Sequence, residues 1–329
     1  MARDDTDSQP TLGICIPAYR RPEFLRKCLA SIIEQSRNLP VRIFVADDSL
    51  TDVNAEVLTD ARAGFPALHF EANSRNLGIN ENIRRVVDMS DTDYVWLIGE
   101  DDIFLNGAIE RVVRYITDAR APFVLCNYAF VGDDHAPLGK LAFATDLPPT
   151  LTPEDFVGGY LWASGFLGAC VVRKAEWERV ASEAYAHTYY AHVGHIVDLL
   201  ARSEALVGVI SEPCVGNRAM DMSGFTWRGD AFGVFLGFER MCAIASQRNP
   251  ELAGSLSSAV IRYRAVLGYL RFRTLVRLRA QQALDLDQYR ERVASSTLTT
   301  AQKVIVHAAC LLPSRLCLAA LNFYRGIAA

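Results

Sequence analysis

Alternating strand-like and helix-like segments between residues 11 and 130 restrict the fold of this 329-residue chain more than any other feature. Short apolar runs, typical of buried strands, separate stretches in which apolar residues recur every three or four positions, as in helices. Chains with this alternation form a mostly parallel, doubly wound sheet with helices on both faces. We therefore predict an α/β fold here.

The alternation can be followed segment by segment. Strands are predicted at residues 11–17, 41–46, 68–71, 94–98 and 123–128, and helices at residues 22–35, 54–62, 83–89 and 107–117. Further along, the pattern predicts a loop at 133–152, strands at 166–172 and 206–210, helices at 175–186 and 189–202, and a polar stretch at 217–229. From Ala231 onward helical patterns dominate, so a helical C-terminal region is expected over 231–329.

Both ends of the chain differ from its middle. Residues 1–10 are polar and acidic, so we expect a disordered leader, and they lack the apolar core of a secretory signal, which favours a cytoplasmic protein. The eight cysteines show neither a CxxC pair nor zinc spacing, and buried reduced thiols are expected.

Charge is distributed unevenly along the sequence. The net charge of −4 gives no reason to expect nucleic acid as a partner. From Ser255 onward, eleven Lys and Arg stand against three Asp and Glu, which leaves −12 on the remainder. Basic residues interleave with apolar ones over 262–279, and such helices lie at an anionic membrane surface or pack on the protein or in a homo-oligomer. No uninterrupted apolar run is long enough to predict a spanning helix.

Polar groups follow three of the predicted strands at the point where each strand ends. They are Tyr19-Arg20, Asp47-Asp48 and Glu100-Asp101-Asp102. In doubly wound sheets, ligands bind beyond the carboxyl ends of the strands. We therefore expect all three groups along one edge of the sheet.

The acidic cluster at 100–102 predicts a divalent metal. Three consecutive carboxylates repel one another, and Mg²⁺ or Mn²⁺ would neutralise them while binding diphosphate oxygens. A solvated turn or a helix N-cap is the alternative for such a triplet. Of the other two groups, a carboxylate at 47–48 could accept a pyrimidine N–H or form an Asx-turn, and the ring and cation at 19–20 could hold a base and a phosphate.

Four ordered motifs give the chain a resemblance to family 2 glycosyltransferases with the GT-A fold. Residues 16–32 (IPAYRRPEFLRKCLASI) are similar to that family's first strand and helix, and residues 44–52 (FVADDSLTD) to its VDDGSTD segment. Residues 76–85 (NLGINENIRR) match the N-x-G-I segment, and residues 96–110 (WLIGEDDIFLNGAIE) the DxD segment. The resemblance implies a nucleotide-sugar-binding half at 11–130 and an acceptor-binding half at 131–230.

The family's donor-binding roles carry over position by position. The residues implied to bind the donor nucleotide sugar are Pro17, Ala18, Tyr19, Arg20, Asp47, Asp48, Asn76, Gly78, Asn82, Glu100 and Arg218. Asp101 matches the last Asp of DxD and is the implied metal ligand. Gly99 occupies the first DxD position, so Glu100 or Asp102 must supply a second carboxylate.

The general base departs from the family pattern. Inverting members carry an Asp, often within Glu-Asp, in the second half, whereas residues 189–202 here read YYAHVGHIVDLLAR. His192, His195 and Asp198 are the groups available to deprotonate an acceptor hydroxyl, with Asp198 on one helical face with His195 to orient its ring. His192 is the favoured base.

The resemblance implies transfer of a sugar from a nucleoside-diphosphate sugar to a saccharide or lipid-linked saccharide, with inversion, in bacterial surface polysaccharide or lipopolysaccharide synthesis. A sugar nucleotidyltransferase would have a glycine-rich phosphate loop after the first strand, which residues 16–23 lack. A non-catalytic nucleotide-sugar-binding protein is the third hypothesis. A peripheral position on the inner face of the cytoplasmic membrane is an additional expectation.

Overall fold

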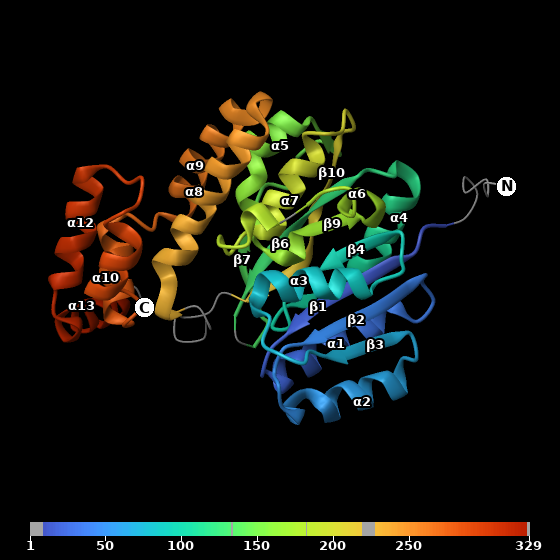
Figure 1. Cartoon of the computed structure of the whole chain (residues 1–329). Helices are drawn as coiled ribbons and strands as arrows, with labels where there is room; N and C mark the ends of the chain where they lie inside the picture. The colour runs from blue at the N-terminus through green and yellow to red at the C-terminus, as the bar shows by residue number, and fades with distance from the viewer. Residues whose placement is uncertain (1–8, 133, 182, 219–227, 328–329) are drawn as a thin grey trace.

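The computed structural model describes residues 9–132, 134–181, 183–218 and 228–327. Most of the predicted leader and much of the polar stretch at 217–229 lie outside these ranges. The described chain forms one ten-stranded mixed sheet flanked by helices, with a separate group of helices at the C-terminal end (Figure 1).

The first half of the chain has the predicted parallel architecture. Its central strands are β1 (Leu12–Ala18), β2 (Val41–Asp47), β3 (Leu68–Ala72) and β4 (Tyr94–Leu97), in the spatial order β3-β2-β1-β4. All pairs among these four are parallel, so their carboxyl ends share one edge. Every residue of β1 is buried, as its apolar run predicts.

Four helices connect these strands and cover the sheet. They are α1 (Pro22–Ser36), α2 (Ala55–Gly64), α3 (Gly78–Met89) and α4 (Ala108–Ala119), with a short 3₁₀ turn, η1 (Asp52–Asn54), before α2. Helix α1 starts at a proline, whose fixed φ suits the first turn, and buries Leu25, Cys28, Leu29 and Ile32 at helical spacing. Helix α1 contacts both α2 and α4, whereas α3 packs on β1 and β2.

The second half differs more from the prediction. Strand β9 (Cys170–Arg173) runs antiparallel between β4 and β6 (Phe123–Val131), and only three residues of the predicted strand at 166–172 join it. Strand β10 (Val207–Arg218) continues eight residues past its predicted end, through an irregularity around Pro213. Short strands β5 (Ile103–Phe104), β7 (Pro137–Leu141) and β8 (Thr150–Leu151) lie within segments predicted to be loops or left unassigned.

The helices of this half are shorter than predicted. The segment at 175–186 forms only α6 (Lys174–Trp177) and a 3₁₀ turn, η4 (Glu183–Tyr185), whereas α7 (Ala191–Leu200) is present as expected. Helix α5 (Pro153–Tyr160) and the 3₁₀ turns η2 (Leu161–Gly165) and η3 (Leu167–Ala169) lead into β9.

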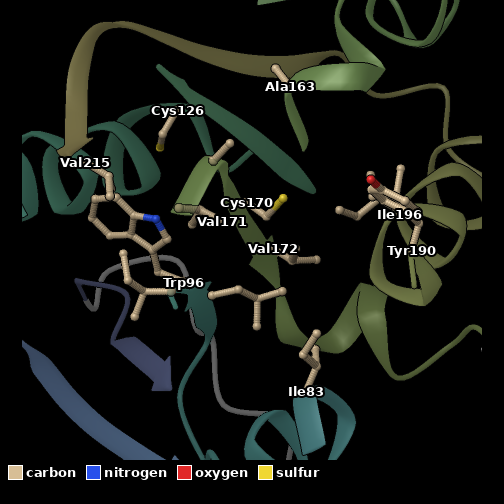
Figure 2. Packing of buried hydrophobic residues seen from close by; sticks show 14 of the residues in the cluster. Ile83, Trp96, Cys126, Ala163, Cys170, Val171, Val172, Tyr190, Ile196 and Val215 are labelled. Carbon is tan, nitrogen blue, oxygen red and sulfur yellow. The ribbon is translucent and has the colours of Figure 1, made fainter. Parts of the chain in front are cut away.

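The core is densest where β4 meets β9. Figure 2 shows the indole of Trp96 among Val171, Cys126 and Val215, and its Nε1 donates a hydrogen bond to the Gly168 carbonyl at 2.8 Å. This bond ties η3 to β4. Because β9 runs antiparallel to β4, it starts at the edge of the sheet where β4 ends.

The C-terminal region is helical, as predicted. Its helices are α8 (Ala231–Arg248), α9 (Ala253–Leu267), α10 (Phe272–Ala280), α11 (Leu286–Gln288), α12 (Thr300–Leu311) and α13 (Ser314–Ile327), with a π-helical turn, η8 (Tyr289–Val293), before α12. Helices α8 and α9 pack on α7 and α5, so they extend the core of the sheet domain. Helices α10, α12 and α13 pack on one another beyond α8 and α9, away from the sheet (Figure 1).

Candidate functional site

The three predicted polar groups meet at the carboxyl edge of the sheet. The backbone amide of Tyr19, after β1, donates a hydrogen bond of 2.8 Å to the carboxylate of Glu100, after β4. The backbone amide of Arg20 donates to the hydroxyl of Ser49, after β2, at 2.8 Å. The prediction that the polar groups after β1, β2 and β4 share one edge is confirmed. Pro17 and Ala18 form the buried end of β1 beneath them.

Glu100 and Asp102 are buried at this edge. Burial raises the pKa of Glu100 to about 8, although the Tyr19 amide and the Arg21 guanidinium favour its ionised form. Burial, together with repulsion from Asp101, also raises the pKa of Asp102, whose carboxylate lies 3.5 Å from the backbone amide of Arg218. Both carboxyls are therefore held within the protein rather than presented to a ligand.

Gly99, at the first DxD position, has a steric reason. A Cβ atom built there would lie 2.7 Å from Oδ2 of Asp102, closer than real Cβ contacts. The space that an aspartate would need is filled by the side chain of Asp102. The departure from the family pattern thus reflects an acidic side chain that packs back against its own turn.

Asp101 is the acidic residue of the cluster that keeps access to solvent, with 20% of its side chain exposed. Its Oδ2 accepts a hydrogen bond of 2.7 Å from Arg21 and lies 3.4 Å from Nη2 of Arg218. The guanidinium of Arg218 stacks over the ring of Phe24, 3.8 Å from its centroid. Two arginines from opposite halves of the chain therefore converge on one carboxylate.

Arg21 and Phe24 are site residues that sequence reasoning missed. Arg20, the predicted phosphate ligand, adopts a left-handed backbone conformation (φ 57°) and directs its Nε to the Ser49 carbonyl instead. Arg21 follows at the start of α1 and faces the acidic cluster. The Arg-Arg-Pro run before a helix, with an aromatic residue three positions later, was the signal available.

Asp47 and Asp48 are buried and hydrogen bonded within the protein. Asp47 accepts hydrogen bonds from Ser49 and Asn54. Asp48 accepts the backbone amides of Leu77 and Gly78 and the side chain of Asn73. Both oxygens of Asp48 accept these hydrogen bonds, so its predicted contact with a base is not prepared in this structure, whereas the bonds to Asp47 all reach Oδ1.

The segment at 76–82 starts α3 five residues earlier than predicted. Asp48, which follows β2, accepts the amides of Leu77 and Gly78 at the start of this helix, and the side chain of Asn76 also accepts the Gly78 amide. Asn76 and Gly78 are exposed at this turn, and Gly78 has φ 72°, which favours glycine. Asn82 is buried and donates to the Ala46 carbonyl, so it joins α3 to β2.

The candidate base residues lie on α7. Nε2 of His192 is 3.1 Å from the Ser164 carbonyl in η2, and Nε2 of His195 is 2.7 Å from the Trp177 carbonyl. A carbonyl only accepts, so each ring carries its proton on Nε2, and both buried Nδ1 atoms lack a hydrogen-bond partner. Burial lowers the pKa of His192 to about 4 and that of His195 below its usual range.

His195 and Asp198 are both held in place by neighbouring side chains. His195 stacks on the indole of Trp177 with ring centroids 3.8 Å apart. Asp198 accepts hydrogen bonds from Tyr185, Arg248 and Asn249, which joins α7 to α8, rather than orienting the His195 ring as expected. This placement favours a structural role over the predicted catalytic one for both residues.

The segment before α7 nevertheless contacts the nucleotide half of the chain. Asn80, in α3, donates to the Ala186 carbonyl at 2.9 Å, which ties the segment before α7 to the nucleotide half. His192 is anchored to η2, which leads through η3 into β9 at the edge where β4 ends. Helix α7, which carries His192, also contacts α3 of the nucleotide half.

The donor set for a metal is smaller than predicted. Within the described ranges, no group of three or more His, Cys, Asp or Glu side chains is arranged to hold an ion, because Glu100 and Asp102 are engaged elsewhere. Asp101 alone offers a partly exposed carboxylate. One protein carboxylate fits a Mg²⁺ or Mn²⁺ ion whose remaining ligands are phosphate oxygens and water.

Comparisons with known proteins agree with this architecture. The Glycosyl transferase family 2 domain matches residues 13–176. Abequosyltransferase RfbV of Salmonella typhimurium is 27% identical over 271 residues, which cover 77% of this chain and 80% of that protein.

Solved structures share the fold at low sequence identity. S. aureus TarS 1-349 in complex with UDP-GlcNAc is 11% identical with a TM-score of 0.57, covering 91% of this chain and 87% of that one. Mannosyltransferase PcManGT from Pyrobaculum calidifontis, in complex with GDP-Man and Mn²⁺, is 16% identical with a TM-score of 0.54, covering 98% and 89%. The fold is thus that of GT-A glycosyltransferases, and the chain belongs to glycosyl transferase family 2.

Proposed function

We propose that this glycosyltransferase moves a sugar from a nucleoside-diphosphate sugar to a hydroxyl of a saccharide or lipid-linked saccharide, with inversion at the anomeric carbon. The observation that carries the proposal is the convergence of Arg21 and Arg218 on Asp101 at the carboxyl edge of the sheet. Two cations beside a solvent-facing carboxylate suit a diphosphate and a divalent ion together.

Each residue has a distinct part in this proposal. Asp101 would hold Mn²⁺ or Mg²⁺, which when bound would offset the charge that develops on the leaving nucleoside diphosphate. The guanidiniums of Arg21 and Arg218 would pair with diphosphate oxygens, and the stack on Phe24 holds the second of them in place. Tyr19, beside Glu100, would lie against the nucleoside.

His192 is the proposed general base. Its Nδ1 carries a lone pair without a hydrogen-bond partner, and its low pKa keeps the ring neutral near pH 7. In the inverting step, the acceptor oxygen bonds to the anomeric carbon as the bond to the diphosphate breaks. The diphosphate leaves with the electron pair, and the hydroxyl proton passes to Nδ1. Because Nδ1 is buried, the acceptor must open the segment between η2 and α7 to reach it.

The acceptor class and the pathway are proposed from similarity to known proteins. Similarity to an abequosyltransferase supports a saccharide or lipid-linked saccharide acceptor and a hexose or deoxyhexose donor. Synthesis of a bacterial surface polysaccharide is the pathway proposed from the family resemblance.

A nucleotide-sugar panel tests this proposal. With Mn²⁺ present, a true donor should raise the unfolding midpoint of the protein by mass action. Asp101→Asn should lose that shift and the transferase activity, whereas an exposed control, Asp88→Asn, should keep both. Full turnover by Asp101→Asn would reject the assignment. Donor binding without transfer or donor hydrolysis would indicate a non-catalytic protein.

The base and the stereochemistry need separate measurements. His192→Ala should lower kcat while donor binding is retained, and the anomeric configuration of the product, read by NMR, should be opposite to that of the donor. An unchanged kcat in His192→Ala would place the base elsewhere. Retention of configuration would contradict the proposed single displacement.

A further inference from the structure

Helices α12 and α13 each present an apolar stripe that the rest of the described chain leaves exposed. On α12 the stripe consists of Val304, Ala308 and Leu311, and on α13 of Leu316, Ala319, Ala320 and Phe323. Between 61% and 69% of Val304, Leu311, Leu316 and Phe323 is exposed. These positions recur every three or four residues, so each stripe runs along one helix face.

The opposite faces of the same helices are buried. Val306, Ala309 and Cys310 of α12 and Cys317 of α13 are covered, and both helices pack on α10. The exposed stripes are therefore a second apolar face, additional to the one that folding requires. Exposed contiguous apolar surface of this kind marks an interaction site.

A fixed bend joins the two stripes. Helices α12 and α13 meet at 93° across Pro313, and Arg279 of α10 donates to the Leu312 carbonyl at 2.8 Å, which holds the bend. Leu311 and Leu316 flank this corner, with the exposed Arg315 between them. The corner thus presents two leucines and a guanidinium together.

The surroundings of the corner are cationic. Arg273 and Arg277 on α10 are exposed, and the chain from Ser255 onward has a net charge of +8 against −12 for the remainder. An apolar face within a basic region complements an anionic lipid surface.

We propose that the face formed by α12, α13 and the exposed arginines of α10 seats the enzyme on an anionic membrane. Leu311, Leu316 and Phe323 enter the boundary between headgroups and acyl chains, while the arginines pair with lipid phosphates. This proposal rests on the C-terminal helices alone and holds whether or not the catalytic assignment does.

Two other occupants fit the observations less well. A second copy placed on the same face would bring two basic regions together, and like charges oppose such contact. A spanning helix does not fit either. Among the described helices none is both long and apolar enough alone, and α12 and α13 pass that test only as a bent pair.

The inferred orientation agrees with two further features. The cytoplasmic leaflet carries the anionic lipids, and all eight cysteines of the chain are free, as expected in a reducing compartment. A seat on that leaflet would hold the transferase where a lipid-linked acceptor is embedded.

Vesicle flotation of the full chain tests the proposal without any donor or acceptor. The protein should float with vesicles of phosphatidylcholine and phosphatidylglycerol and bind vesicles of phosphatidylcholine alone much more weakly. Leu311→Gln and Leu316→Gln should each weaken binding about tenfold. Arg273→Gln and Arg277→Gln should each weaken it about fivefold. Raising the salt from about 0.1 M to about 1 M shortens the screening length from ~10 Å to ~3 Å and should reduce the electrostatic part.

Matched controls lie on the sheet domain. Leu138→Gln, exposed on β7, and Arg114→Gln, exposed on α4, should float like the wild type, and so should the inactive Asp101→Asn. All of these side chains are exposed or partly exposed, so an unchanged urea midpoint will show that each variant is folded. Absence of vesicle binding by the wild type, or binding by the two leucine variants as strong as that of the wild type, would overturn the proposal. The proposal would also be overturned if the wild type forms a dimer that is lost in the leucine variants while their vesicle binding is unaffected.

Discussion

The guanidinium of Arg21 lies 2.7 Å from the carboxylate of Asp101, although 80 positions of sequence separate the two residues. Arg21 starts α1 and Asp101 follows β4, so their contact depends on the parallel pairing of β1 with β4. This ion pair sets the charge at the point where the donor diphosphate is proposed to bind.

Removal of the Arg21 charge should weaken donor binding. In Arg21→Gln, Asp101 loses one of two cationic neighbours and the diphosphate loses a donor, which should raise the donor Kd about tenfold, measured by calorimetry with Mn²⁺. Arg26→Gln on the same helix, whose guanidinium lies 4.0 Å from Asp60 at the surface, is the control and should leave Kd unchanged. An unchanged Kd in Arg21→Gln would show that Arg21 positions Asp101 and does not bind the donor.

A methyl group at Gly99 should destabilise the fold. The added Cβ of Gly99→Ala would displace the Asp102 carboxylate from a buried site, at a cost of about 1–3 kcal/mol in the free energy of unfolding by urea. Gly64→Ala, at the end of α2, has no atom within 4 Å of its new Cβ and should leave stability unchanged or raise it by up to about 1 kcal/mol. Equal stability of the two variants would contradict the steric account of the missing first Asp.

The free energy of unfolding should decrease as the pH is lowered, because His192 is buried in its neutral form. Burial lowers its pKa from 6.5 in the unfolded chain to about 4 in the folded protein, so the folded state resists protonation. Its contribution is complete above pH 6.5 and is lost progressively as the pH falls toward 4, by ~3 kcal/mol in total. Urea unfolding at pH 7 and pH 5 should show a smaller loss for His192→Asn than for the wild type. The exposed His187→Asn should behave like the wild type. Parallel profiles for all three proteins would contradict a buried neutral ring.

Asp198→Asn should affect stability rather than chemistry. The carboxylate joins Tyr185, Arg248 and Asn249, and its loss should cost about 2–3 kcal/mol after allowance for the partial exposure of Arg248. The kcat of the folded variant should stay within about threefold of the wild type, because no reacting group is removed, a change worth under ~1 kcal/mol. The control Asp88→Asn, which removes the exposed ion pair with Arg84, should lower the free energy of unfolding by less than about 0.5 kcal/mol. Loss of kcat in a stable Asp198→Asn protein would restore the catalytic role expected from the sequence.

The sequence predicted the nucleotide half well because its signals are local. Continuous apolar runs indicate β1, β2 and β4, and the carboxyl-edge rule for parallel strands predicts that Tyr19, Asp48 and Asp101 lie together. Features fixed by distant partners were not predictable. At the start of helix α3, Gly78 donates its amide both to the neighbouring Asn76 and to Asp48, which follows β2 and lies 30 positions away in the sequence.

The second half depended on similar long-range effects. Strand β10 extends to Arg218 through polar residues, because pairing with β6 rather than an apolar pattern defines it. The three-carboxylate metal site was expected from three consecutive acidic residues after a predicted strand and from the resemblance to the DxD segment. Because Glu100 and Asp102 are buried, Asp101 is the carboxylate of the three that could bind a metal. Burial of this kind depends on tertiary packing.

The reversed direction of β9 brings a segment from the second half of the chain to the edge where the donor is proposed to bind. Since β9 begins where β4 ends, the turns η2 and η3 reach the reaction edge without being part of β1, β2 or β4. On the proposed entry of the acceptor between η2 and α7, substitutions over 161–169 should change the product while the donor stays the same. Chimeras that exchange only these nine residues with a relative should change acceptor choice and keep donor affinity.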